Sequence, residues 1–256
     1  MTDLSRRFAG LDRLYGAAQG EAVRRAHVVV VGIGGVGSWA AECLARSGVG
    51  RLTLIDMDHV AESNINRQVQ ALSSTIGLAK VIAMRQRIEE INPVCDVRMI
   101  DDFVTPQNWL ELLPKGIDAV IDCCDQVQAK IAMANWARMV RTPFVSVGAA
   151  GGKRLAHQVN VADLCEVTHD PLLAKMRYAL RRQHDAQKNG KKIGVTCVFS
   201  REPVQPPVDS CDANSDSTLN CHGYGSSMAV TATFGLCASG WVIDKLANPT
   251  HRTLAS

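Results

Sequence analysis

The sequence predicts an α/β fold in which a mostly parallel central sheet carries helices on both faces. Apolar, strand-like runs alternate with helix-like runs between residues 27 and 147. The strand-like runs are short and almost continuously apolar, as expected where helices cover both faces of a sheet. This alternation stops after residue 148, so we expect a C-terminal elaboration beyond it.

The alternating elements can be assigned in order along the chain. Turn-forming Gly, Pro, Asn and Asp residues separate them, which is typical of βαβ units. We expect strands at 27–31, 51–55, 97–100, 119–122 and 144–147, and helices at 38–47, 77–91, 109–113 and 126–140.

The second part of the chain is less regular. A strand is expected at 158–161, followed by a helix that Asp170 caps and Pro171 starts. Residues 201–225 are rich in Pro, Ser, Asp and Asn and have no periodicity, so we expect a mobile loop. The apolar run 228–243 is shorter than the roughly 20 residues that span a bilayer, which favours a buried helix over membrane insertion.

Size and composition are consistent with one domain over residues 1–256, with a nucleotide-binding half at 1–150 and a substrate-facing half at 151–256. The net charge of +3 is too small to indicate nucleic-acid binding by itself. Nine cysteines, an odd number without a C-x-x-C pair, predict a reducing cytoplasm and no zinc. Because residues 1–20 are polar and contain arginine, we expect no signal sequence there.

The strongest motif is a strand that runs into G-x-G-x-x-G and then into a helix. Its glycines are Gly32, Gly34 and Gly37, with Gly35 inside the turn. Such a turn lets backbone N–H groups approach a phosphate at a helix N-terminus. Asp56 ends the next strand, where an acid typically binds a ribose hydroxyl. The pattern predicts a nucleotide or dinucleotide site, and a structural turn without ligand is the alternative.

Two cations downstream favour ATP over NAD. Arg67 follows the ribose acid by eleven residues, and Lys80 begins a helix thirteen residues later. A departing pyrophosphate gains charge in the transition state, which such cations stabilise, whereas hydride transfer has no such need. Solvated surface cations are the alternative interpretation. Asp125, just after the strand at 119–122, is a candidate Mg²⁺ ligand or a helix N-cap.

Together, the motifs G-I-G-G-V-G-S, D-M-D, N-I-N-R-Q, G-L-A-K and D-C-C-D resemble the ThiF-like adenylating enzymes, which include ubiquitin-activating enzymes and sulfur-carrier activators. The resemblance implies a Rossmann-like, ThiF-type fold that binds ATP and Mg²⁺. It implies ATP binding by Gly32, Gly34, Gly35, Gly37, Asp56, Asp58, Asn64, Arg67 and Lys80, catalytic roles for Arg67, Lys80 and Asp125, and Mg²⁺ at Asp125.

The sequence departs from this family at two points. Family members usually form homodimers in which an N-terminal arginine enters the partner's site, but Gly10 occupies the aligned position and Arg13 is the nearby basic residue. Sulfur-carrier activators also carry two zinc-binding C-x-x-C pairs, which are absent here.

Motifs at 103–108, 148–152, 170–175, 194–200 and 230–235 resemble a narrower branch, the tRNA threonylcarbamoyladenosine dehydratases. This resemblance implies that ATP activates the threonyl carboxylate of the modified adenosine beside the anticodon, and that ring closure follows with loss of water. Two alternatives remain: adenylation of the C-terminal Gly of a ubiquitin-like sulfur carrier, and an NAD-binding Rossmann module.

A basic segment suggests where tRNA would bind. Seven cations against one acid, Asp185, could neutralise phosphates, although a solvated helix face is the alternative. The cations are Lys175, Arg177, Arg181, Arg182, Lys188, Lys191 and Lys192.

The resemblance also suggests a monovalent cation and a cysteine-desulfurase sulfur-relay protein as partners. For Cys197 we favour a buried inert thiol over a nucleophile, and for Cys221 and His222 no paired role.

Overall fold

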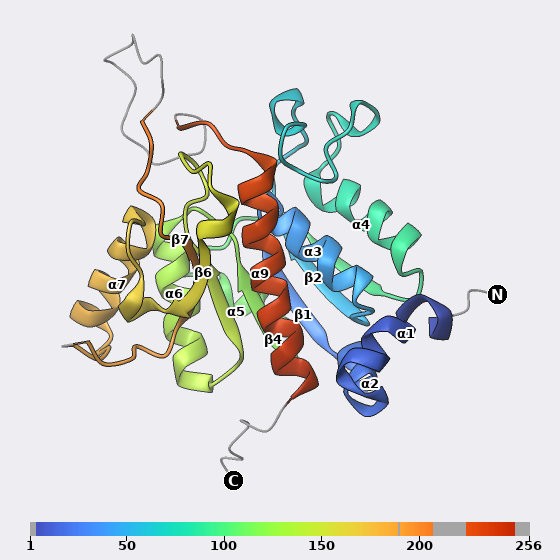
Figure 1. Cartoon of the computed structure of the whole chain (residues 1–256), viewed down its shortest axis with the longest axis horizontal. Coiled ribbons are helices and arrows are strands. Elements are labelled where there is room, and N and C mark those ends of the chain that lie inside the picture. Colours follow the sequence, from blue (N-terminus) through green and yellow to red (C-terminus); the bar gives the residue numbers. More distant parts are fainter. Residues whose placement is uncertain (1–3, 189, 207–223, 249–256) are drawn as a thin grey trace.

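The computed structural model describes residues 4–188, 190–206 and 224–248. The described residues form a seven-stranded sheet with the strand order β3-β2-β1-β4-β5-β7-β6 (Figure 1). Every neighbouring pair is parallel except β6 and β7. The predicted mostly parallel α/β fold is therefore confirmed. The strands are β1 (His27–Val31), β2 (Arg51–Ile55), β3 (Asp96–Ile100), β4 (Ala119–Asp122), β5 (Phe144–Val147), β6 (Val159–Asp163) and β7 (Thr196–Ser200).

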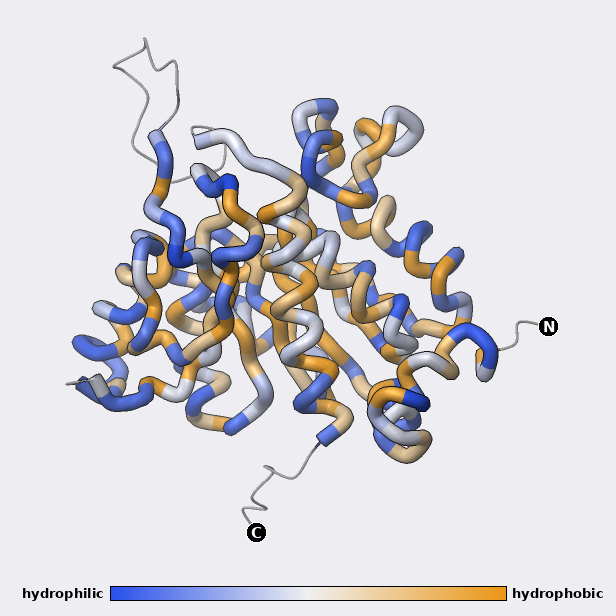
Figure 2. Tube along the Cα trace, in the orientation of Figure 1, coloured by the Kyte–Doolittle hydropathy of each residue, from blue (hydrophilic) through white to orange (hydrophobic). Residues whose placement is uncertain are grey.

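Helices cover both faces of the sheet, and alternate residues of the strands meet them. In β1, Val28 and Val30 pack into the core on one face, whereas Val29 and Val31 pack into the core on the other. Side chains in the central strands are therefore buried on both sides, which explains their continuous apolar character. The first face carries α2 (Ala17–Arg25), α3 (Gly37–Arg46), α4 (Lys80–Ile91) and α9 (Met228–Ala247), and the second carries α5 (Trp109–Leu112), α6 (Val127–Val140) and α7 (Pro171–Gln183). Figure 2 shows hydrophobic residues concentrated in the central strands and polar residues toward the periphery.

The apolar run near the C-terminus forms α9, which packs along α3 (Figure 1). A Cβ on Gly235 would lie 2.5 Å from the Val36 carbonyl oxygen, so the helices approach closely where glycine is required. Ser239 Oγ donates to the Ala40 carbonyl at 3.0 Å. The prediction of a buried helix is confirmed. Among the helices described, none has both the length and the apolar character needed to cross a membrane.

Several element boundaries differ from those predicted. The helix expected at 77–91 begins at Lys80, because Gly77 adopts a positive φ of 87° and 73–75 form a 3-10 turn instead. α9 continues four residues past the predicted end at 243, to Ala247. The N-terminal helices α1 (Leu4–Tyr15) and α2 were not predicted; each is mostly polar and buries few residues, Phe8 in α1 and Gly20 and Val23 in α2.

The sheet order creates a switch point between β1 and β4. From β1 the chain passes outward through β2 and β3, and it then returns to β4 and continues outward through β5 on the other side. The connecting segments at the carboxyl ends of β1 and β4 thus diverge, leaving the crevice where open α/β sheets bind ligands. The glycine turn follows β1 and residues 123–125 follow β4, so both meet at this crevice.

Candidate nucleotide site

The glycines of the turn have different structural roles. Gly32 has a φ of 83°, and a Cβ there would lie 3.0 Å from the Cys123 carbonyl. A Cβ on Gly37 would overlap the Gly32 carbonyl oxygen. A Cβ on Gly34 would meet nothing within 4 Å. Gly32 and Gly37 are therefore needed for the turn itself, whereas Gly34 borders open space, as a phosphate-binding position requires.

Asp56 braces this turn from the end of β2. Its Oδ2 accepts the Ile33 N–H at 2.6 Å and its Oδ1 accepts the Asp58 N–H at 2.9 Å. Burial raises the pKa of Asp56, and the positive charge of Lys80 and these two N–H donors partly offset that effect. A carboxylate offers about four lone-pair sites, so acceptor capacity remains for a ribose hydroxyl.

Asp58 and Lys80 form a close pair beside the turn. Lys80 Nζ lies 2.7 Å from Asp58 Oδ2, and the Lys80 backbone N–H donates to the Asp58 carbonyl at 2.9 Å. Only the Asp58 side chain is well exposed, at 55% compared with 8% for Lys80. Of the two helix starts expected from the sequence, residue 77 and Lys80, the structure has the second. Asp58 therefore fixes the position of the Lys80 ammonium group.

Arg67 reaches the turn from the segment after β2. A Cβ on Gly35 would lie 3.3 Å from Arg67 Cγ, so the arginine stem borders the turn. Its Nη1 donates to the Ser63 carbonyl at 2.7 Å and to Asn66 Oδ1 at 2.9 Å. Trp39 Nε1 donates to the Arg67 carbonyl at 2.9 Å, so this tryptophan, interpreted from sequence as a core residue, also fixes the arginine backbone.

Asn64 stabilises the same segment from within. It is buried in a short 3-10 turn, η1 (Glu62–Asn64), and its Oδ1 accepts the Ala61 N–H at 3.0 Å. The structure thus gathers the predicted ATP-binding residues around the switch point. Their contacts with a nucleotide stay predictions.

Asp125 is exposed at the carboxyl end of β4. The N-cap of α6 is Gln126, without a side-chain capping bond, so the interpretation of Asp125 as the helix cap is wrong. Its Oδ1 has a long contact of 3.5 Å with Gln126 Nε2. Mg²⁺ in nucleotide sites usually takes one or two carboxylates plus phosphates and waters, and this exposed carboxylate fits that role. In the described ranges, no three or more His, Cys, Asp or Glu side chains gather as a metal cluster.

A buried ion pair lies directly behind residues 123–125, and sequence analysis missed half of it. Lys130 Nζ lies 3.0 Å from Asp122 Oδ2, and both side chains are 0% exposed. Burial alone would lower the pKa of Lys130, but Asp122 raises it, so the lysine stays charged. Removing one partner of such a pair typically costs about 3–5 kcal/mol. The available signal was one lysine among the buried apolar positions of α6.

A second turn adjoins this pair at the end of β5. Asp170 Oδ1 accepts the Leu173 N–H at 2.9 Å, confirming the predicted cap of α7, and Oδ2 accepts the Ala149 N–H at 2.9 Å. A Cβ on Gly148 would overlap Asp170 Oδ2. Burial raises the pKa of Asp170, opposed by these N–H donors and by Lys130.

The segment after β7 is attached beside this second turn. The Gln205 N–H donates to the Gly152 carbonyl at 2.8 Å, and Glu202 Oε2 accepts the Leu155 N–H at 2.8 Å. Of the predicted mobile loop 201–225, residues 201–206 thus have ordered contacts, while 207–223 lie outside the described residues.

Cys197 is fully buried in β7. Burial raises the pKa of its thiol well above the ordinary value, which matches the expected inert thiol. Cys221 and His222 lie outside the described residues.

The basic residues around α7 divide into two groups. Lys175, Arg182, Lys188, Lys191 and Lys192 are exposed. Arg177 and Arg181 instead donate to protein carbonyls: Arg177 Nη1 to Val167 at 2.7 Å, and Arg181 Nε to Gln187 at 3.2 Å.

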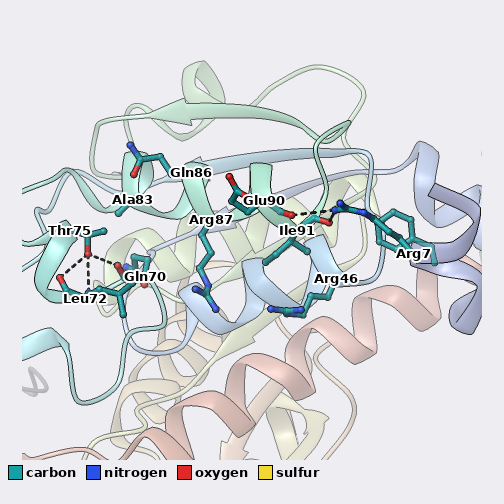
Figure 3. Close-up of a pocket in the computed structure, with 11 residues that line it drawn as sticks. Arg7, Arg46, Gln70, Leu72, Thr75, Ala83, Gln86, Arg87, Glu90 and Ile91 are labelled. Atoms are coloured by element: carbon teal, nitrogen blue, oxygen red, sulfur yellow. Dashed lines mark hydrogen bonds between the residues drawn. The ribbon is translucent and has the colours of Figure 1, made fainter. Parts of the chain in front are cut away.

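A cavity of about 720 Å³ lies among residues of α1, α3, α4 and the segment before α4 (Figure 3). Arg7, Arg46 and Arg87 line it. Gln70, at one end of the cavity in Figure 3, donates its Nε2 to the Ile33 carbonyl at 2.9 Å, so one wall contacts the glycine turn.

A glycine turn at a switch point, a carboxylate beneath it and two cations beside it define a nucleotide-binding α/β protein of the adenylating class. The chain belongs to the ThiF family, whose model matches residues 4–253. The predicted family is thus confirmed.

Relatives within the family match almost the whole chain. The tRNA threonylcarbamoyladenosine dehydratase of Haemophilus influenzae is 44% identical over 94% of this chain and 93% of its own length. Its namesake in Escherichia coli is 45% identical over the same shares. The crystal structure of the E. coli enzyme in complex with ATP aligns with a TM-score of 0.87 at 42% identity, covering 98% of this chain and 97% of that chain.

Proposed function

We propose that this protein is an ATP-dependent dehydratase acting on threonylcarbamoyladenosine in tRNA. The observation that supports the use of ATP is the open space at Gly34 in the turn that Asp56, Arg67 and Lys80 adjoin, whereas the choice of reaction is supported by the relatives. Relatives of that activity match along nearly the full chain, including one whose structure holds ATP.

In this proposal, the threonyl carboxylate attacks the α-phosphate of ATP, which forms an acyl-adenylate and releases pyrophosphate. A nitrogen of the same modification then attacks the activated carbonyl and loses its proton, and AMP leaves with the former carboxylate oxygen. The net change in the nucleoside is the loss of one water. Activation is required because a carboxylate is a poor electrophile until one oxygen becomes part of a leaving group.

The protein's own residues would serve this chemistry by binding and by electrostatics. N–H groups at Gly34 and Gly35 face the phosphates, and Asp56 accepts from the ribose. Arg67 and Lys80 stabilise charge that gathers on the leaving pyrophosphate, the kind of contribution worth about 10²–10³ in rate. Asp125 would hold Mg²⁺, which neutralises phosphate charge when bound.

For tRNA we propose a contact surface of Lys175, Arg182, Lys188, Lys191 and Lys192, all exposed. Such side chains can pair with phosphates, so affinity should fall with rising salt. Arg177 and Arg181 stay predicted tRNA contacts, although each already donates to a protein carbonyl.

The direct test is a mass assay. Wild-type protein, ATP, Mg²⁺ and tRNA carrying threonylcarbamoyladenosine should yield a nucleoside lighter by one water. Lys115→Met, which alters an exposed lysine before β4, serves as the control and should act as wild type. An unchanged nucleoside mass with wild-type protein and bound ATP would refute the proposal.

A second candidate, adenylation of the C-terminal Gly of a sulfur carrier, is favoured by one relative. The adenylyltransferase and sulfurtransferase MOCS3 of Drosophila sechellia is 33% identical over 83% of this chain, which covers 38% of that protein. Pyrophosphate exchange that requires a protein ending in Gly-Gly, and not tRNA, would support it. Tight NADH binding without a response to ATP would instead support the NAD module.

Homodimerisation, a sulfur-relay partner, a monovalent cation, the division at residue 150 and a cytoplasmic location also stay predictions. Analytical ultracentrifugation tests the first of these. Arg13 lies on α1, near the aligned Gly10, and in a dimer it could reach the second copy.

A further inference from the structure

Lys130 connects the ends of two neighbouring strands. Its ammonium group, on α6, donates to Asp122 Oδ2 at 3.0 Å at the end of β4. It also donates to the Val147 carbonyl at 2.7 Å and to Ser146 Oγ at 3.3 Å at the end of β5. Ser146 Oγ donates in turn to Asp122 Oδ2 at 2.6 Å, which closes the network.

The first of these strand ends leads to Asp125, the proposed Mg²⁺ ligand, and the second leads to the turn of the 148–152 motif. Asp122 Oδ1 accepts the Cys124 N–H at 3.2 Å and so shapes the residues that lead to Asp125. Val147 is followed by Gly148, and the next N–H, of Ala149, donates to Asp170 at 2.9 Å. Lys130 thus lies between the turn at the nucleotide and the turn of the 148–152 motif.

The chemistry of the network requires an ammonium group. A carboxylate, a carbonyl and a hydroxyl converge on one buried point, and an ammonium offers three N–H donors in different directions. Burying a charged pair does not by itself stabilise a fold more than apolar packing would. A core that needed only to be filled would therefore have no use for this lysine.

We infer that Lys130 is a positioning residue that fixes the separation between the turn carrying Asp125 and the turn beginning at Gly148. It is fully buried and acts through its neighbours. Misplacement by about 1 Å can cost about 100-fold in rate, so loss of this link should lower turnover. The inference rests on the proposed function for what the two turns bind.

The single variant Lys130→Met leaves the Asp122 carboxylate buried without a countercharge, so its melting temperature should fall by about 10 °C. The double variant Lys130→Met/Asp122→Asn removes both charges while keeping similar volumes and an acceptor for the Cys124 N–H. We expect its melting temperature to return close to that of the wild type. Lys115→Met is the matched control for loss of a lysine on the surface.

The decisive measurements use the double variant. We expect its turnover per folded molecule to fall by about 100-fold, with the KM for ATP changed less than about threefold. In calorimetry, ATP affinity without Mg²⁺ should match that of the wild type, and the gain in affinity on adding Mg²⁺ should be lost. Ser146→Ala, which removes one contact, should show a smaller loss of turnover at nearly unchanged melting temperature.

Wild-type turnover and a wild-type Mg²⁺ response in both the double variant and Ser146→Ala would overturn the inference. Losses that vanish when activity is normalised to folded protein would do the same, because they would reflect stability alone. Inactive wild-type protein on modified tRNA would count against the proposed function instead, and the Mg²⁺-dependent ATP titration would still decide the role of Lys130.

Discussion

Lys80 Nζ lies 2.7 Å from Asp58 Oδ2, and the two residues are also joined through the backbone. The pair holds a largely buried cation beside Asp56 and the glycine turn. Because the carboxylate is 55% exposed, its attraction for the lysine is screened, and an incoming polyanion can compete for the ammonium group.

Lys80→Met should therefore weaken ATP binding and lower the rate of pyrophosphate release by about 100-fold, since one donor to a developing charge is lost. Asp58→Asn should change ATP affinity by less than about fivefold, because an ion pair with one solvent-exposed partner contributes at most about 1 kcal/mol. Calorimetry and a pyrophosphate assay measure both. Equal losses of ATP affinity and of pyrophosphate release in the two variants would mean that the ion pair only stabilises the local structure.

Two glycine variants should separate binding from folding. Gly37→Ala places a methyl group on the Gly32 carbonyl oxygen and should lower the melting temperature by several degrees. Gly34→Ala meets no protein atom within 4 Å, so stability should be unchanged while ATP affinity falls at least about tenfold. Thermal denaturation with and without ATP checks this. Normal ATP affinity in Gly34→Ala would show that Gly34 does not face the phosphates.

Arg67→Ala should lower kcat/KM for ATP by about 10²-fold, and Arg67→Lys should restore only part of it, because lysine lacks the planar fork. Asn66→Ala, which removes one acceptor of the Arg67 guanidinium at 2.9 Å, is the matched control and should lose much less. The readout is steady-state kinetics. If Asn66→Ala lowered kcat/KM as much as Arg67→Ala, the loss in both variants would come from disturbed structure of the segment that carries Arg67, and not from the loss of its charge.

Asp163 should make stability sensitive to acid. Burial alone would raise its pKa, but N–H donors outweigh this effect and lower the pKa: Cys165 and Ile193 at 2.9 Å and Gly194 at 2.8 Å. A lowered pKa in the folded protein means that the stabilisation is fully present above the ordinary value of 3.8 and is lost as pH falls through the folded pKa. Asp163→Asn should therefore destabilise at pH 7, by about 1–3 kcal/mol.

Urea unfolding of wild type and Asp163→Asn from neutral pH down to about pH 3 measures this difference. It should stay constant above pH 5 and shrink in acid. A difference that grows as pH falls would contradict the assigned direction of the pKa shift.

The exposed cations near α7 should govern tRNA affinity. The double variant Lys191→Ala/Lys192→Ala should raise the KM for modified tRNA and leave ATP binding unchanged. The slope of log tRNA affinity against log salt concentration should become shallower by the equivalent of up to about two phosphate contacts. Arg177→Ala should instead lower the melting temperature, because its guanidinium donates to the Val167 carbonyl. An unchanged salt dependence of tRNA affinity in the double variant would mean that tRNA binds to another surface of the protein.

Much of the fold followed from local patterns. β1, β2, β4 and β5 begin and end at the predicted residues, because short apolar runs bounded by Gly and Asp leave little freedom in where a buried strand ends. For α4 the sequence analysis gave both residue 77 and Lys80 as the start, and it did not predict the turn before Lys80, since the positive φ of Gly77 depends on contacts with the 58–60 segment.

By itself, the sequence determined the types and order of the functional groups: a strand, a glycine turn and a helix, then an acid, two cations and a second acid. These features depend on short-range sterics and periodicity, which neighbouring residues encode. Only the tertiary structure decided that Lys130 meets Asp122 and Val147, or that Trp39 holds Arg67. Such contacts depend on the strand order and on which helix covers which face of the sheet. The free energy of a buried charge depends on the groups around it, and these groups come from residues that are distant in the sequence.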